Sequence, residues 1–225
     1  MSPVEQTERN AMHTTFVRAT TLSAIALVMA SSTAMAQPAI RLGGGAPPVP
    51  TGIEAPAGAT MFFKAHAIGT QNYVCLPAAT GVAWKFVAPQ ATLFETFFGS
   101  LTQQLATHFL SPNPDENALP PRATWQHSLD SSRVWARVMN PAINSSIDPS
   151  YVEAGAIPWL LLTVVGAEAG PEGGAFLTHA AFIQRVNTSG GVAPAAGCSQ
   201  PVEVGAVTLV PYTADYLFYR APRAR

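Results

Sequence analysis

The sequence predicts a single all-β domain, either a β-sandwich or a closed barrel of about ten short strands, with the sandwich slightly favoured. Three observations lead to this fold class. Short apolar segments recur between turn-forming stretches, and the 225 residues include 20 prolines and 17 glycines, which disfavours a helical bundle. Strands and helices do not alternate, and no segment is repeated. Hydrophobic residues make up 48% of the chain, enough to build a sizeable core.

The N-terminal 36 residues are expected to be a cleavable signal peptide. A mildly basic segment precedes an apolar stretch at residues 22–30, and Ala34-Met35-Ala36 provides the small residues of a cleavage site. An uncleaved anchor and a buried helix are the alternatives, and residues 1–11 are interpreted as an upstream extension. Because the apolar stretch is far shorter than the roughly 20 residues that span a bilayer, we expect a secreted or periplasmic protein with no membrane span after cleavage.

Three further segments are expected after the signal peptide. Residues 37–58 are a flexible Pro/Gly-rich leader that lies over the core, residues 59–220 are the all-β domain, and residues 221–225 are a tail. Within the domain, strands are expected wherever β-forming apolar residues lie between turn signals. The ten expected strands are residues 60–67, 70–77, 82–89, 104–110, 124–129, 132–139, 156–167, 176–188, 202–210 and 213–220.

The segments between these strands are interpreted from their turn residues and their spacing. Ile68-Gly69 is expected to be a turn between the first two strands. Residues 90–105 are ambiguous, because leucine and phenylalanine recur there at a spacing of four and allow a short helix. Gly190-Gly191 supplies the positive φ of a tight turn. The adjacent Ser189 lacks the Gly-x-Ser-x-Gly pattern of a hydrolase nucleophile, so we interpret this stretch as a turn only.

Alternation along the last strand assigns its side chains to two faces. Tyr212, Tyr216 and Phe218 share one face, and Asp215 and Tyr219 share the other. Such aromatic residues usually fill a core. A solvated aromatic row would instead stack on sugar rings or aromatic ligands, and Trp125 is the candidate binding residue of this kind.

Export gives the two cysteines a structural meaning. In an oxidising compartment, Cys75 and Cys198 most simply form one disulfide that closes a loop of more than a hundred residues. Two separate buried thiols are the alternative. A catalytic cysteine is disfavoured, because nothing near either residue would stabilise a thiolate.

Eight stretches, taken in order, resemble a secreted family catalogued as domain of unknown function 3455. The resemblance covers roughly residues 59–220 and implies a single exported domain without an established activity. The chain departs from the usual Asp-Gly-Ser of this family at Asp130-Ser131-Ser132, which puts in doubt any role that needs a glycine there. The stretches are GTQNYVC, WKFVAPQATLF, ATHF, ATWQHSLDSSRV, AIPWLLL, FIQRVNTSGGVAP, GC and VPYTADYLFY.

Arg185 is the most informative charged residue, because it lies inside an apolar strand. A buried guanidinium without a partner costs several kcal/mol, so a carboxylate is expected nearby. Asp215 is the first candidate partner and Asp130 the second. The pair would either fix the strand register or leave Arg185 as an anion-binding residue at the mouth of a pocket.

The histidines provide the remaining candidates for chemistry. His108 lies in a stretch that matches the family and is the leading acid/base or ligand candidate. His66 is expected to be a hydrogen-bonded core residue, and His127 and His179 are expected to be exposed at the surface or to lie near turns. No HExxH or His-x-His pattern occurs, so no metal site is assigned, although zinc ligands can come from distant strands.

These observations favour a non-enzymatic extracellular or periplasmic module that binds an unidentified small molecule or envelope ligand. The alternative is a hydrolase or metal-dependent enzyme that uses His108 with Asp130 or Arg185. A formal net charge of -1 and 11% charged residues give no basic surface for nucleic acid, and no motif predicts a cofactor.

Overall fold

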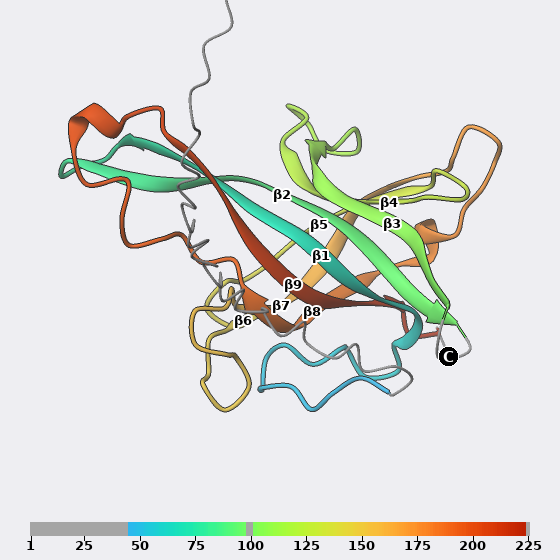
Figure 1. Cartoon of the computed structure of the whole chain (residues 1–225). Coiled ribbons are helices and arrows are strands. Elements are labelled where there is room, and N and C mark those ends of the chain that lie inside the picture. Colours follow the sequence, from blue (N-terminus) through green and yellow to red (C-terminus); the bar gives the residue numbers. More distant parts are fainter. Residues whose placement is uncertain (1–44, 98–100, 224–225) are drawn as a thin grey trace, which may run out of the picture. The chain divides into compact units, whose positions relative to one another are not determined.

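A computed structural model describes residues 45–97 and 101–223, which form nine strands and two short 3-10 helices (Figure 1). The expected signal peptide lies outside the described residues. Within those residues, no helix is long and apolar enough to cross a membrane. The elements are β1 (Thr60–Pro77), β2 (Val82–Phe97), β3 (Leu101–Pro112), β4 (Pro121–His127), β5 (Arg133–Arg137), β6 (Ser145–Ser146), β7 (Trp159–Glu168), η1 (Leu177–His179), β8 (Phe182–Gly190), η2 (Pro201–Glu203) and β9 (Val207–Arg220).

The strands form one antiparallel sheet that closes on itself. Its order is β5-β4-β3-β2-β1-β9-β8-β7-β6, and an additional pairing of β5 with β7 closes eight strands into a barrel. The short β6 pairs with the start of β7, outside the closed ring. The all-β prediction is therefore confirmed, and of the two expected architectures the chain adopts the barrel. An eight-stranded barrel has an interior just wide enough for packed side chains or one small ligand.

Several of the expected short strands are parts of longer ones. The turn predicted at Ile68-Gly69 is wrong, because both residues lie in the middle of β1. A Cβ atom at Gly69 would clash with the backbone of Gln90 and Ala91 on β2. The glycine therefore permits a close approach of two strands rather than a change of direction. In the same way, residues 207–210 of one expected C-terminal strand and the whole of the other belong to one strand, β9, which contains Pro211. The strand expected at residues 202–206 is wrong, because these residues lie in η2 and the turn that follows it.

The helix considered for residues 90–105 is also wrong for the part that the structure describes. Residues 90–97 belong to β2 and residues 101–105 to β3, and the two strands pair in antiparallel register. Ala91 and Leu93, two positions apart, both belong to the core, as the period of a strand requires. The expected strand at 176–188 is likewise divided between η1 and β8.

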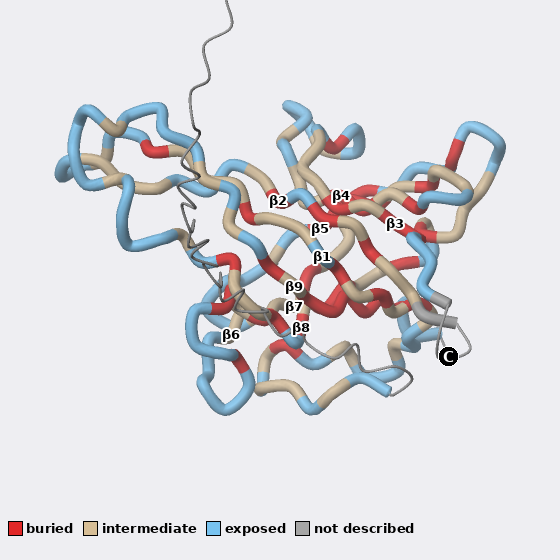
Figure 2. Tube along the Cα trace, viewed as in Figure 1, coloured by how far each residue is buried: buried red, intermediate tan, exposed pale blue. Residues whose placement is uncertain are grey.

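The barrel interior is filled at the end where η1 lies. Leu177 of η1 is fully buried, and Phe63, Ile183 and Phe218 pack in the same cluster. The rings of Phe63 and Phe218 have centroids 5.1 Å apart. Burial is accordingly concentrated along the strands of the barrel (Figure 2). This packed end leaves room for a ligand only toward the other end.

The described part of the leader packs on the outside of the barrel. Ile53 is fully buried in a second cluster with Trp159, Val186 and Leu217. Its carbonyl oxygen accepts a hydrogen bond of 2.7 Å from Nε2 of the buried Gln184. This contact satisfies a polar side chain that faces outward from β8, so the segment around Ile53 covers the outer face of the sheet.

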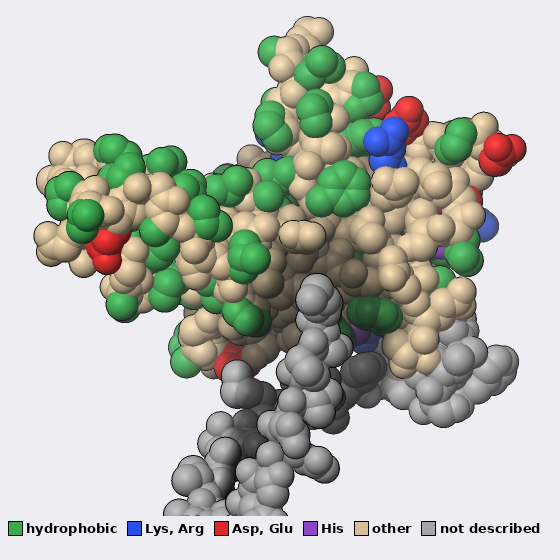
Figure 3. All heavy atoms as spheres, turned by 45° about the horizontal axis from the view of Figure 1, so that its top comes forward, with side chains coloured by type: hydrophobic (Ala, Val, Ile, Leu, Met, Phe, Trp, Pro, Cys, Tyr) green, Lys and Arg blue, Asp and Glu red, His purple; other side chains and the backbone are tan. Residues whose placement is uncertain are grey.

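An arm extends from the barrel where β1, β2 and β9 pair only with one another, at residues 71–77, 82–90 and 207–211 (Figure 1). The segment 191–206 joins β8 to β9 along this arm. Gly190 and Gly191 have φ values of 66° and 88°, so the predicted positive φ is confirmed. The chain nevertheless continues into this long segment instead of forming a tight hairpin. Apolar side chains are exposed on the arm, including Val202 at 90% (Figure 3).

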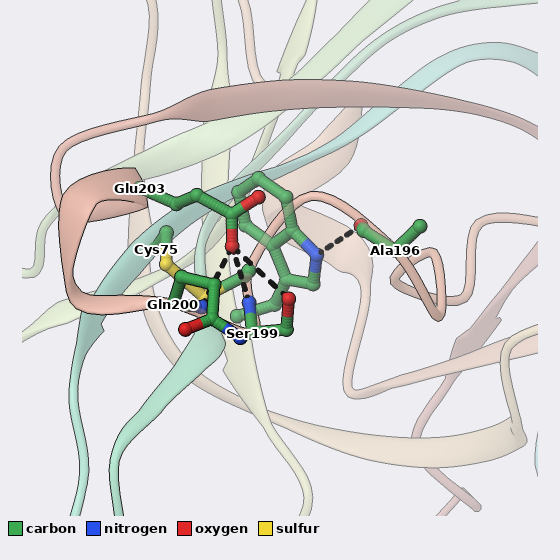
Figure 4. The surroundings of a disulfide bond; sticks show 7 residues. Cys75, Ala196, Ser199, Gln200 and Glu203 are labelled. Carbon is green, nitrogen blue, oxygen red and sulfur yellow. Dashed lines mark hydrogen bonds between the residues drawn. A yellow bond between two sulfur atoms is a disulfide. The ribbon is translucent and has the colours of Figure 1, made fainter.

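A disulfide between Cys75 and Cys198 ties the segment 191–206 to β1, which confirms the predicted bridge. The Cys75 amide donates to Ala206 O at 2.8 Å, and the Gly205 amide donates to Cys75 O at 2.9 Å. Around the bridge, Glu203 accepts hydrogen bonds from the backbone amides of residues 199 and 200 (Figure 4). The arm is therefore held by one covalent bond and a local hydrogen-bond network.

Candidate functional site

The barrel contains a cavity of about 390 Å³ at the end away from η1, and all eight strands of the closed ring contribute to its lining. Its wall is largely apolar, and two of its members, Ala123 and Ala136, are small enough to leave space inside the ring. A cavity of this size lies at the lower end of the range for small-molecule sites. The other apolar wall residues include Leu110, Val138, Leu160 and Leu162.

Arg185 brings a positive charge to this cavity. On β8 it lies opposite Leu160 of β7 and Tyr216 of β9. Its Nε and Nη2 atoms donate to the carbonyl oxygen of Pro158 at 3.1 and 2.9 Å. Among the described residues, no carboxylate forms an ion pair with it, and the lining residues include a second cation, Arg137, but no Asp or Glu. The guanidinium is thus hydrogen-bonded but has no counter-ion within the described part of the chain.

His108 of β3 lines the same cavity and is only 3% exposed. Its ring stacks on Trp125 with centroids 4.2 Å apart and an angle of 9° between the planes. Its Nδ1 lies 2.9 Å from the carbonyl oxygen of Thr124, which can only accept, so Nδ1 carries the proton. Burial lowers the pKa of His108 to about 3, the charge of Arg185 acts in the same direction, and the bond to Thr124 opposes both. The imidazole is therefore neutral at pH 7.

Two tyrosines, a glutamine and the indole N–H of Trp125, which has no hydrogen-bond partner among the described residues, add further polar groups to the lining. Tyr216 lies beside both His108 and Arg185. Its ring centroid is 5.2 Å from that of His108, and it pairs with Arg185 across the sheet. Burial raises the pKa of Tyr216, and the charge of Arg185 opposes this effect. Tyr73 donates to Gly191 O at 2.7 Å. Gln71 is 4% exposed, and its Nε2 has no hydrogen-bond partner in the described part of the chain.

Asp215 lies outside this site, so the predicted ion pair with Arg185 is wrong. Arg185 is opposite Tyr216, and the next residue along the strand, Asp215, faces the other side of the sheet. There its carboxylate accepts from His66 Nδ1 at 2.8 Å and from Asn187 Nδ2 at 2.9 Å, as expected of a hydrogen-bonded His66. Burial raises the pKa of Asp215, but these hydrogen bonds and the charge of Lys64 outweigh it and hold the pKa below its ordinary value.

Asp130 is not a partner of Arg185 or of His108 either. It lies in the turn between β4 and β5, where it accepts hydrogen bonds from His127 Nδ1 and from the amides of Ser132 and Phe176. Burial raises the pKa of Asp130, and these hydrogen bonds more than reverse the effect. Of the two alternatives for His127, the position near a turn is confirmed, because His127 directly precedes this turn. Exposure is not, because the residue is 7% exposed and stacks on Phe176, whereas His179 is exposed. Asp130 therefore organises a turn at the filled end of the barrel.

The same turn contains position 131, where the family resemblance leads one to expect glycine and this chain has serine. Ser131 has a φ of 59°, a left-handed conformation that glycine adopts without strain. We expect Ser131→Gly to raise the free energy of unfolding by about 0.5 kcal/mol, because the relief of strain exceeds the added flexibility of the unfolded chain. Urea unfolding monitored by fluorescence measures this change. Ser131→Ala retains the Cβ atom and is the matched control, and an equal gain in both variants would contradict the explanation.

The structure thus brings together three of the sequence candidates, namely His108, Arg185 and Trp125, and excludes two, Asp130 and Asp215. Sequence reasoning missed Gln71 and Tyr73. A signal was present, because they continue the two-residue period of the inward-facing Ala65 and Ala67 past Gly69. Within residues 45–97 and 101–223, no group of three or more His, Cys, Asp or Glu side chains is placed to hold a metal ion.

A closed antiparallel barrel with a partly polar interior cavity defines a class of protein whose fold can enclose one small ligand. The chain belongs to the family described as proteins of unknown function (DUF3455), whose sequence pattern matches residues 56–220, so the family resemblance is confirmed. No curated protein and no solved structure matches the chain. The activity of the protein must therefore be inferred from the cavity itself.

Proposed function

We propose that this protein is a non-enzymatic binding module that holds a small organic anion with an apolar body inside its barrel. One observation carries the proposal: the apolar cavity contains the guanidinium of Arg185, and its described lining residues include no carboxylate. A cation in apolar surroundings without a counter-ion is stabilised by a bound anion. Arg137, at the edge of the same cavity, adds to the positive potential that would attract such a ligand.

An extracytoplasmic location, either secreted or periplasmic, is part of the proposal. The disulfide between Cys75 and Cys198 supports it, because disulfides persist mainly in oxidising compartments. The signal-peptide pattern that ends at Ala36 supports it independently. N-terminal sequencing of the exported protein, with Gln37 as the expected first residue, tests this part separately from ligand binding.

The properties of His108 favour binding over hydrolysis. A general base is most effective when its pKa lies near the working pH, whereas burial lowers that of His108 to about 3. In a hydrolase triad a carboxylate usually accepts the Nδ1 proton and orients the catalytic histidine, whereas here the carbonyl oxygen of Thr124 takes that position. Asp130, the carboxylate that the hydrolase alternative required, is engaged with His127 and Ser132. The cavity is therefore better suited to holding a ligand than to activating water.

We expect Arg185→Gln to weaken the binding of a small aromatic carboxylate about 30-fold, because a charge-assisted hydrogen bond would be lost. Isothermal titration calorimetry with benzoate and with the neutral benzamide measures the effect. Wild-type protein should prefer benzoate, and the variant should bind both weakly. Near-ultraviolet circular dichroism confirms that the variant is folded.

Two matched variants sharpen this test. Arg185→Lys retains the charge and should keep part of the preference for the anion. Arg137→Gln removes the cation at the edge and should weaken binding only about 3-fold, because an exposed charge is screened by solvent. Equal affinity of wild-type protein and Arg185→Gln for benzoate, or no binding of any carboxylate tried, would refute the proposed function.

A further inference from the structure

His108 presents a hydrogen-bond acceptor to the cavity. Its Nδ1 proton is directed at Thr124 O, so Nε2 retains a lone pair. No partner for Nε2 occurs among the residues that the structure describes. The stack on Trp125 fixes the plane of the ring, and burial keeps it neutral at pH 7. A ligand that satisfies Nε2 must therefore carry an N–H or O–H donor.

The opposite requirement comes from Arg185 and Gln71. The guanidinium donates to Pro158 O through Nε and Nη2 and also interacts with the hydroxyl of Tyr216, which leaves part of its five N–H groups for an acceptor on a ligand. The Nε2 amide of Gln71 is a buried donor that makes no hydrogen bond of good geometry among the described residues, although it interacts with the hydroxyl of Tyr212. A buried donor of this kind is costly unless a ligand or water accepts its hydrogen bond. Both groups suit the two oxygen atoms of a carboxylate.

Tyr216 shows that these two requirements belong to one site. It pairs with Arg185 across β8 and β9, and its ring centroid lies 5.2 Å from that of His108. Arg185 and His108 therefore both neighbour the same tyrosine, and Gln71 lines the same cavity. The volume of about 390 Å³ suits a small ligand, and the lining contains the rings of Tyr73, Phe86 and Trp125. Aromatic walls favour a flat aromatic body through stacked and edge-to-face contacts.

We propose that the ligand of this cavity is a hydroxy-substituted aromatic carboxylate, with its carboxylate bound by Arg185 and Gln71 and its hydroxyl donating to Nε2 of His108. This inference rests on the proposed anion-binding function and specifies the ligand class. In this proposal His108 determines specificity, because it selects ligands with a hydroxyl group, whereas Arg185 selects only for negative charge.

The test compares ligands that differ only in the donor. Calorimetry on the intact mature protein measures the affinities of benzoate, 3- and 4-hydroxybenzoate and 4-methoxybenzoate. At least one hydroxybenzoate should bind roughly tenfold more tightly than benzoate, because it makes one additional buried hydrogen bond. The methoxy compound has a similar size but no donor, so it should not share the advantage.

A pair of variants at one position then tests the role of His108. His108→Asn retains a donor near the position of Nδ1 for Thr124 O and lacks Nε2, so it should abolish the tenfold preference. His108→Gln places an amide near the position of Nε2 and should preserve part of it. Thermal unfolding and near-ultraviolet circular dichroism verify that both variants are folded. The role of His108 is then judged from the difference between the two variants.

The possible results separate this inference from the proposed function. Equal binding of all four carboxylates, lost in Arg185→Gln, would overturn the ligand class and leave the anion-binding function intact. A hydroxyl preference that persists in His108→Asn would overturn the role of His108. Absence of binding by all four carboxylates would overturn both. The tenfold preference, lost in His108→Asn and retained in part in His108→Gln, is the result that supports the inference.

Discussion

Removing the disulfide, by combining Cys75→Ala with Cys198→Ser, is expected to lower the free energy of unfolding by about 4 kcal/mol. The two cysteines are 123 positions apart, so the bond closes a long loop and strongly restricts the unfolded chain. The chain-entropy estimate for a loop of about 100 residues is about 4.7 kcal/mol, and residual structure in the unfolded state reduces it. Urea unfolding of the mature protein, followed by fluorescence and far-ultraviolet circular dichroism, measures the loss.

The effect should have a local component on the arm. Cys75 and the backbone amide of Gly205 lie in the same hydrogen-bond network, so hydrogen exchange of residues 199–206 should accelerate more than exchange within the barrel. Wild-type protein reduced with dithiothreitol serves as the control and should match the double variant. A loss below about 1 kcal/mol, or uniform acceleration of exchange, would show that the disulfide does not hold the arm as the structure suggests.

The fold class was predictable because strand signals are local. The alternation of Tyr212, Tyr216 and Phe218 on one face is confirmed, since all three are buried in the interior cluster. Strand ends were not predictable where the deciding contact is remote. Gly69 was predicted to form part of a turn, but its function is to let Ala91 of another strand approach. Barrel closure likewise depends on the pairing of β5 with β7, which no local pattern indicates.

The candidate site was predictable in its members but not in their partners. Apolar flanks correctly marked Arg185 as a residue of the interior, and the family stretch marked His108. The expectation that Asp215 neutralises Arg185 failed because cross-strand register decides which residues face each other, and a shift by one residue reverses the face. Since the charge has no carboxylate partner among the described residues, the cavity becomes a candidate anion site instead of a structural ion pair.

Acid is expected to destabilise the protein through His108. In the unfolded chain this histidine takes up a proton near pH 6.5, whereas in the folded chain burial lowers its pKa to about 3. Between these values the unfolded state binds more protons, so stability falls as the pH falls. Stability contributed by the neutral, buried ring is fully present above pH 6.5 and decreases by about 1.4 kcal/mol for each pH unit below it. From pH 7.5 to pH 4 the contribution of His108 is about 3 kcal/mol.

The measurement is the free energy of unfolding at pH 7.5 and pH 4 for wild-type protein and for His108→Asn. Carboxylates whose pKa is lowered in the folded state, such as Asp215 and Asp130, remain in both proteins. So do the groups that act on His108, namely Arg185 and Tyr216. The difference between the two pH dependences therefore isolates His108. His179→Gln, at an exposed position, is the control and should retain the full acid sensitivity of the wild type. If His108→Asn loses as much stability as the wild type, the imidazole is not held neutral inside the barrel, and its role as a hydrogen-bond acceptor for the ligand fails with it.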